Sequence, residues 1–175
     1  KKKKKEQAVF PYDLSALAEK NGGYSLLKST PYGNNLTTDF AIEAIDAENL
    51  GQDADTDFLV ISYSATDYVG HNFGVNSKEV EDTYIRLDQD LAWLLKTLDQ
   101  KVGKGKYTVF LTADHGAVNV PAYLSDQKIP SGYFDNRAFE TALNEFVVSE
   151  YGKEGLIEDI SNYQVFFNYE NLTAA

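Results

Sequence analysis

Two short apolar runs, each followed by an aspartate and a histidine, constrain the fold of this chain more than any other feature. The runs are Phe58–Ile61 and Val109–Leu111. The acidic and imidazole residues that follow them are Asp67, His71, Asp114 and His115. The chain has 2 histidines, and both lie in these positions. Runs that are apolar at every position are typical of central strands in a parallel sheet covered by helices.

The segment between the two runs predicts a long helix. Residues 76–102 carry a leucine-rich stripe at helical spacing, with Asn76 as the expected N-cap and Gly103 after the last turn. With strands at 56–63 and 107–112, the order is that of a parallel crossover, and ligands of such sheets bind beyond the carboxyl ends of the strands. The sequence therefore predicts an α/β fold, a mostly parallel sheet with flanking helices, and both Asp/His pairs at one edge.

Further elements follow from periodicity and turn residues. Helices are expected through Leu14–Ala18, Thr38–Leu50 and Asp135–Tyr151, and a strand over Gln164–Tyr169. Residues 24–29 read as a brief strand or turn, and residues 30–35 as a loop. Apart from Lys1–Lys5, which we interpret as a tag or a disordered basic tail, residues 6–175 are predicted to form a single α/β domain.

Composition excludes several classes of function. The chain of 175 residues has a net charge of -11, although five lysines lie at its N-terminus, so a basic patch for duplex nucleic acid is not expected. No apolar run is long enough to span a bilayer. The absence of cysteine excludes a thiolate metal site and a disulfide framework. An acidic surface still permits phosphate-ester binding where cations neutralise the site. The sequence does not indicate an oligomeric state.

The donor set favours a zinc site. Imidazole nitrogen and carboxylate oxygen both suit zinc, and four such ligands could close one structural site or be divided between two ions. The spacing favours division: a loop would bring Asp67 and His71 around one ion, whereas adjacent Asp114 and His115 point apart unless the turn is sharp. Each motif alone has a simpler reading, as a helix-capping aspartate or a packed histidine. Both motifs after consecutive strands favour metal binding.

These residues also carry a family resemblance. The pattern Ser64-x-x-Asp67-x-x-Gly70-His71-x-Phe73-Gly74, followed by Thr112-Ala113-Asp114-His115-Gly116, resembles the alkaline phosphatase superfamily. More narrowly, it is similar to the type I phosphodiesterase/nucleotide pyrophosphatase group and its bacterial periplasmic, phosphate-irrepressible monoesterase branch. The similarity runs from about Tyr24 to the C-terminus.

The resemblance implies a two-zinc phosphohydrolase, periplasmic or secreted, that acts on small phosphate esters. Asp67 and His71 would bind the zinc that activates water, and Asp114 and His115 would bind the zinc beside the nucleophile. In the family a threonine or serine attacks phosphorus and forms a covalent intermediate.

Parts of the family pattern have no match here. We find no upstream metal-binding aspartate, no nucleophile motif and no histidine after His115. The hydroxyls of residues 29–30 and 37–38 have no base beside them and fit caps or turns better. We therefore expect an internal fragment of a larger catalytic domain that carries four of six protein ligands, no catalytic nucleophile and little activity alone. The alternatives are a phosphodiesterase or nucleotide pyrophosphatase, and a non-catalytic module that keeps the fold.

Overall fold

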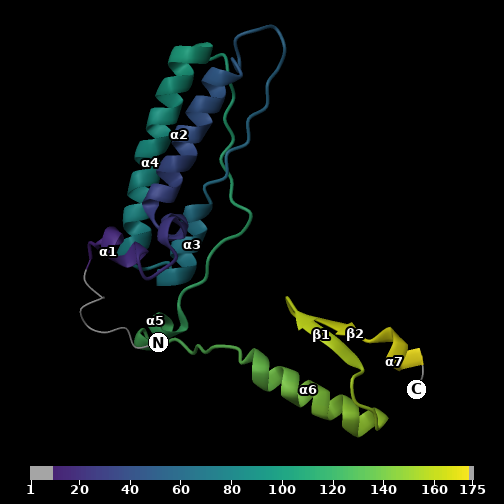
Figure 1. Cartoon of the computed structure of the whole chain (residues 1–175). Helices are drawn as coiled ribbons and strands as arrows, with labels where there is room; N and C mark the ends of the chain where they lie inside the picture. Colours follow the sequence, from purple (N-terminus) through teal and green to yellow (C-terminus); the bar gives the residue numbers. More distant parts are fainter. Residues whose placement is uncertain (1–9, 174–175) are drawn as a thin grey trace. The chain divides into compact units, whose positions relative to one another are not determined.

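The computed structural model describes residues 10–173, and these divide into two compact units (Figure 1). The first unit is Lys1–Leu124 and the second is Ser125–Ala175. The basic run Lys1–Lys5 lies outside the described residues. The expectation of a single domain over residues 6–175 stays a prediction, and each unit is described here by itself.

The described part of the first unit is helical. Its elements are α1 (Leu14–Ala18), the 3₁₀ helix η2 (Gly23–Ser29), α2 (Pro31–Ala47), α3 (Ser64–Phe73), α4 (Lys78–Leu98) and the π-helical turn η3 (Asp99–Gly103). Figure 1 shows α2 and α4 side by side, with α3 beside one end of the pair. A short helix, α5 (Pro121–Asp126), lies at the division between the units. Among the described helices, none has the length and apolarity needed to cross a membrane.

The core of this unit lies between α2, α3 and α4. Its buried side chains recur at helical spacing: Asn34, Thr38, Ala41 and Ile45 on α2; Ala65 and Val69 on α3; Val80, Thr83, Asp90, Leu94 and Thr97 on α4. Several of these side chains are polar, which burial disfavours unless they are hydrogen-bonded. Asp90 is satisfied across the helix pair, because Asn35 Nδ2 donates to its two carboxylate oxygens at 2.7 and 2.8 Å. The core between these helices therefore contains both apolar side chains and buried, hydrogen-bonded polar side chains.

Two helix starts differ from the sequence prediction. Helix α2 begins at Pro31, seven residues before the predicted start, because a proline at the first helical position needs no backbone N–H partner. The 3₁₀ helix of Gly23–Ser29 replaces the predicted strand or turn. Helix α4 is capped by Ser77 rather than Asn76, with Ser77 Oγ accepting from the Val80 N–H at 3.2 Å. The expected helix α1 is confirmed.

Helices α2 and α3 approach closely at Gly33. A Cβ added at Gly33 would lie 2.8 Å from the Leu27 carbonyl oxygen and 3.0 Å from the Ala65 Cβ. The absence of a side chain at Gly33 therefore allows η2, α2 and α3 to meet. Helix α3 ends at Gly74, whose φ of 86° lies in the region that glycine adopts most readily.

The two predicted central strands are not paired in the described structure. Residues 56–63 and 107–112 have no strand hydrogen bonding, and within the described residues the sheet is the antiparallel hairpin of the second unit. Their apolar side chains are open to solvent: Phe58 is 86% exposed and Phe110 is 85% exposed. A strand needs a hydrogen-bonded neighbour, and among the described residues these segments have none.

The second unit combines a helix with a hairpin. Helix α6 (Asn136–Tyr151) matches its prediction, with Asp135 Oδ1 accepting from the Ala138 N–H and left-handed Gly152 at its end. Strands β1 (Ile157–Ser161) and β2 (Gln164–Phe167) pair antiparallel through the turn of Asn162 and Tyr163, both with positive φ, as the type I′ turn of a two-residue hairpin requires. A short helix, α7 (Tyr169–Thr173), follows. Strand β1 was not predicted.

The close approach at Gly33 leads to a stability prediction. Gly33→Ala should lower the free energy of unfolding by about 1–3 kcal/mol, because the added methyl overpacks the contact with Leu27 and Ala65. Gly70→Ala is the matched control: it is also helical, but its Cβ would meet nothing within 4 Å. This control should be neutral or stabilise the chain by up to about 1 kcal/mol. Urea denaturation followed by circular dichroism measures both, and equal effects would contradict the packing argument.

Candidate metal centre

Asp67 and His71 lie on one face of α3. The sequence prediction placed them on a loop, and this was wrong, because the segment is helical. Ala65 and Val69 of the same helix are buried. Residues four apart on a helix are neighbours, which brings Asp67 Oδ1 to 3.4 Å from His71 Nε2. Asp67 lies in the first turn, where the helix dipole favours a negative charge.

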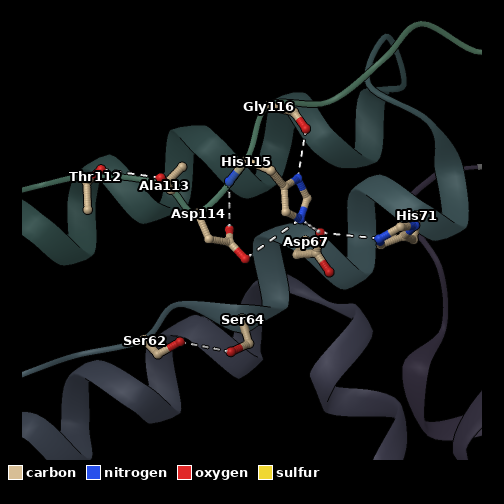
Figure 2. Close-up of polar contacts among 9 residues, drawn as sticks. All are labelled: Ser62, Ser64, Asp67, His71, Thr112, Ala113, Asp114, His115 and Gly116. Atoms are coloured by element: carbon tan, nitrogen blue, oxygen red, sulfur yellow. Dashed lines mark hydrogen bonds and ion pairs between the residues drawn. The ribbon is translucent and has the colours of Figure 1, made fainter. Parts of the chain in front are cut away.

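The second pair reaches the first from the extended segment after Leu111. Figure 2 shows Asp67 between the two imidazoles, with His115 Nε2 at 3.6 Å from Asp67 Oδ1. His115 Nε2 is also 3.8 Å from Asp114 Oδ2. The chain bends at Asp114, where Asp114 Oδ1 accepts a hydrogen bond from the His115 backbone N–H at 3.1 Å. This local bend lets adjacent side chains turn toward the same point, as the prediction required.

The backbone of Gly116 orients the His115 ring. His115 Nδ1 lies 2.8 Å from the Gly116 carbonyl oxygen, which can only accept, so Nδ1 carries the hydrogen (Figure 2). In neutral imidazole, this leaves the lone pair on Nε2, the atom that faces Asp67 and Asp114. Metal-binding histidines characteristically donate their other N–H to a carbonyl or carboxylate in this way. Sequence reasoning missed this contact because a backbone acceptor leaves no mark in the sequence.

The same contacts raise the pKa of His115 above its ordinary value. The hydrogen bond to the Gly116 carbonyl is the largest cause, and the charges of Asp114 and Asp67 act in the same direction. A proton on Nε2 competes with a metal ion for the same lone pair. The four side chains are open to solvent, from 49% exposed for Asp67 to 91% for Asp114.

The donor atoms fit pairwise metal ligation. Two ligands of one tetrahedral zinc lie about 3.3–3.4 Å apart, given bond lengths of about 2.0–2.1 Å. The Asp67–His71 separation of 3.4 Å matches this, and the Asp114–His115 separation of 3.8 Å is somewhat longer. Within residues 10–173, no set of three or more His, Asp or Glu residues has an arrangement that could hold a metal ion. His115 Nε2 lies closer to Asp67 Oδ1, at 3.6 Å, than to Asp114 Oδ2, at 3.8 Å, so the division of the four side chains between two ions stays a prediction.

The hydroxyl groups considered as nucleophiles have other partners. Thr30 Oγ1 donates to the Leu27 carbonyl at 2.9 Å, and Thr37 Oγ1 donates to the Gly33 carbonyl at 3.0 Å. Thr38 Oγ1 lies 3.2 Å from the Asn34 carbonyl and 3.0 Å from the Tyr63 hydroxyl. Ser62 and Ser64 point toward each other, with their Oγ atoms 3.1 Å apart (Figure 2).

Comparison with known proteins defines the class. The model of the type I phosphodiesterase / nucleotide pyrophosphatase family matches residues 8–175. The chain therefore belongs to this family of phosphoesterases.

Particular relatives are similar over nearly the whole chain. It is 46% identical over 165 residues to alkaline phosphatase PafA of Elizabethkingia meningoseptica, covering 94% of this chain and 30% of that protein. It is 53% identical over 168 residues to a protein of Myroides odoratus named calcium-transporting ATPase, covering 95% of this chain and 30% of that protein. The crystal structure of wild-type PafA superposes with a TM-score of 0.88 at 45% identity, covering 95% of this chain and 31% of that chain.

These likenesses confirm two predictions from the sequence. The resemblance to the alkaline phosphatase superfamily is confirmed, and the fold is part of an alkaline phosphatase fold, α/β in the family. The chain spans about 30% of the length of the relatives that it matches. The roles of Asp67, His71, Asp114 and His115 as metal ligands stay predictions.

The electrostatic origin of the His115 pKa can be tested directly. Asp114→Asn should lower the pKa of His115 by removing a negative charge that favours the imidazolium, while Asn keeps an oxygen for the bond from the His115 N–H. The pKa should still remain above its ordinary value, because the bond to Gly116 is retained. NMR titration of the histidine ring protons, in chelator-treated protein, measures the change. Asp88→Asn on the exposed face of α4 is the control, and an unchanged His115 pKa in Asp114→Asn would contradict this assignment.

Proposed function

We propose that this chain supplies Asp67, His71, Asp114 and His115 as ligands to a two-zinc centre of a phosphomonoester hydrolase of the alkaline phosphatase superfamily. One observation supports this most strongly. Asp67 Oδ1 lies 3.4 Å from His71 Nε2 and 3.6 Å from His115 Nε2, although the two histidines are 44 positions apart in the sequence. Two acid–imidazole pairs thus share one point on a solvent-open surface.

The side chains at this site provide negative charge and an oriented imidazole lone pair, both of which favour cation binding. Asp67 and Asp114 bring two negative charges, and the Gly116 carbonyl keeps the Nε2 lone pair of His115 directed toward them. Asp67 and His71 form one ligand pair on α3, and Asp114 and His115 form the other. When bound, the zinc ions would supply Lewis acidity at the phosphoryl group and a lowered pKa for bound water. In this proposal the threonine or serine nucleophile and the remaining ligands belong to a part of the enzyme outside this chain.

The unpaired apolar segments support the proposal that the active protein is longer. Residues 56–63 and 107–112 are extended toward the site, and side chains such as Phe58 and Phe110 are solvent-exposed. Both segments read as strands that are buried on two faces. We propose that the additional length of the family members, about 70% of their residues, includes the strands that pair with them. On this basis the isolated chain has little or no hydrolytic activity.

The substrate class is the finer part of the proposal. We favour small phosphate monoesters, following the similarity to an alkaline phosphatase, and a periplasmic or secreted location as in the resemblance from the sequence. The family's description also names phosphodiesterases and nucleotide pyrophosphatases, so a diester or a nucleotide pyrophosphate is the second candidate. Rates with p-nitrophenyl phosphate, bis-p-nitrophenyl phosphate and ATP distinguish these substrates. A non-catalytic module would hydrolyse none of them.

Loss of either histidine tests the metal proposal. In a protein that carries this chain within the full length of its relatives, His71→Ala and His115→Ala should each lower kcat/KM for p-nitrophenyl phosphate by at least about 100-fold, because each removes a direct metal ligand. Bound zinc should fall in both variants. Initial rates and metal content by mass spectrometry provide the two readouts.

Asp88→Ala is the matched control, since it removes an exposed carboxylate from α4 without touching the site. It should retain both the rate and the zinc. Wild-type rate and metal content in either histidine variant would overturn the proposed ligand set. Turnover of p-nitrophenyl phosphate by the 175-residue chain, at the rate of the longer protein, would overturn the proposal that the nucleophile lies elsewhere.

A further inference from the structure

Helix α3, which carries Asp67 and His71, is attached to its neighbours by side-chain hydrogen bonds next to both residues. Asn34 Nδ2 of α2 donates to Thr66 Oγ1 at 3.0 Å, one residue before Asp67. Asn72 Nδ2, one residue after His71, donates to Ser29 Oγ of η2 at 3.0 Å. The N-cap residue Tyr63 is held too, with its hydroxyl 3.0 Å from Thr38 Oγ1. Three bonds therefore link α3 to η2 and α2.

The α2 side of this attachment is deeply buried. Asn34 is 1% exposed and Thr38 is 0% exposed. A buried amide is costly, and the Asn34 Oδ1 has no hydrogen-bond partner among the described atoms. Apolar side chains of the same shape in place of both Asn34 and Thr66 would be nearly neutral for stability. What the Asn34 amide adds is a directional bond to Thr66, the residue before Asp67.

Packing of Ala65 and Val69 sets the buried face of α3, and the directed hydrogen bonds restrain its rotation more narrowly. The contact between Gly33 and Ala65 sets the distance between α2 and α3. It restrains the rotation of α3 about its axis only weakly, because both residues are small. Rotation matters at the site, since successive residues of a helix are separated by about 100° around its axis. A modest rotation would move Asp67 Oδ1 away from His115 Nε2, which comes from a separate segment. The bonds to Thr66 and Tyr63 oppose this rotation.

We infer that Asn34 and Thr38 of α2 are positioning residues for the metal centre, acting through Thr66 and Tyr63 to fix the rotation of α3 and hold Asp67 between the two imidazoles. The inference rests on the proposed function, because it assigns these residues to the same zinc site. Neither residue touches a metal or a substrate. Supporting groups around a metal site change its affinity when they are removed, even though they bind no ion.

Conservative variants of Thr66 and Tyr63 test the inference. Thr66→Val and Tyr63→Phe each remove a hydroxyl and keep nearly the same volume. In a protein that carries this chain within the full length of its relatives, each should weaken zinc binding by about 10–100-fold, and the visible spectrum of bound Co²⁺ should change because the ligand geometry changes. Thr66→Ser restores a hydroxyl at the same position and should restore wild-type affinity. Zinc affinity is measured by competition with a chromophoric chelator, under conditions where every variant is folded by circular dichroism.

Thr83→Val is the matched control for loss of a buried threonine hydroxyl. Thr83 is 0% exposed on α4, and its Oγ1 donates within that helix to the Glu79 carbonyl at 2.7 Å. Thr83→Val should keep the wild-type zinc affinity and Co²⁺ spectrum whatever its effect on stability.

The outcomes separate this inference from the proposed function. If wild type binds zinc, His71→Ala does not, and Thr66→Val and Tyr63→Phe bind as Thr83→Val does, the positioning role is overturned and the ligand set stands. If wild type binds no zinc, or His71→Ala binds as tightly as wild type, the proposed ligand set fails and this inference fails with it. Selective loss in Thr66→Val and Tyr63→Phe, with recovery in Thr66→Ser, supports the positioning role.

Discussion

The close contact of α2 with α3 at Gly33 is the constraint on which the candidate site depends. Because Gly33 has no side chain, Ala65 and the Leu27 carbonyl lie where a Cβ would otherwise be. This contact puts the first turn of α3 against α2 and leaves the face with Asp67 and His71 toward solvent. Asp67 can then meet the segment that carries Asp114 and His115.

The candidate ligands are exposed to solvent, whereas the residues that support them are buried. The four candidate ligands are exposed, so their mutual interactions are screened by water and their own contacts restrain them little. The residues behind them form a buried layer in which Asn34, Thr38 and Asp90 make directed polar contacts. The buried hydrogen bonds behind the site therefore restrain the exposed candidate ligands more than the contacts among those ligands do.

Sequence reasoning succeeded where one local signal determined the structure. Helix α6 has an aspartate cap, an amphipathic stripe and a terminal glycine, and it was predicted to within one residue. The Asp/His pairs were expected to converge, and Asp67 and His115 do lie close together. That prediction used the order of elements around the long helix, which survives in α4 even though the flanking strands are unpaired here.

Sequence reasoning failed where tertiary contacts override local preference. Helix α3 contains Tyr68, Val69 and Gly70, which are weak helix formers, and it is stabilised by burial of Ala65 and Val69. Strand β1 includes Glu158 and Asp159, which are uncommon in strands, and its formation depends on pairing with β2. The hydrogen bond from Asn34 to Thr66 joins residues 32 positions apart, so no local pattern could indicate it.

The hydrogen bond between His115 and Gly116 has a consequence for sequence drift. Its acceptor is a main-chain carbonyl, which every amino acid possesses, so the tautomer of His115 does not depend on the identity of a neighbouring side chain. A Cβ at position 116 would meet nothing within 4 Å, and the φ of Gly116 is not positive. The backbone conformation at residues 115–116 thus selects the tautomer of His115 with hydrogen on Nδ1. This selection can persist in homologues whose side chains around the site differ.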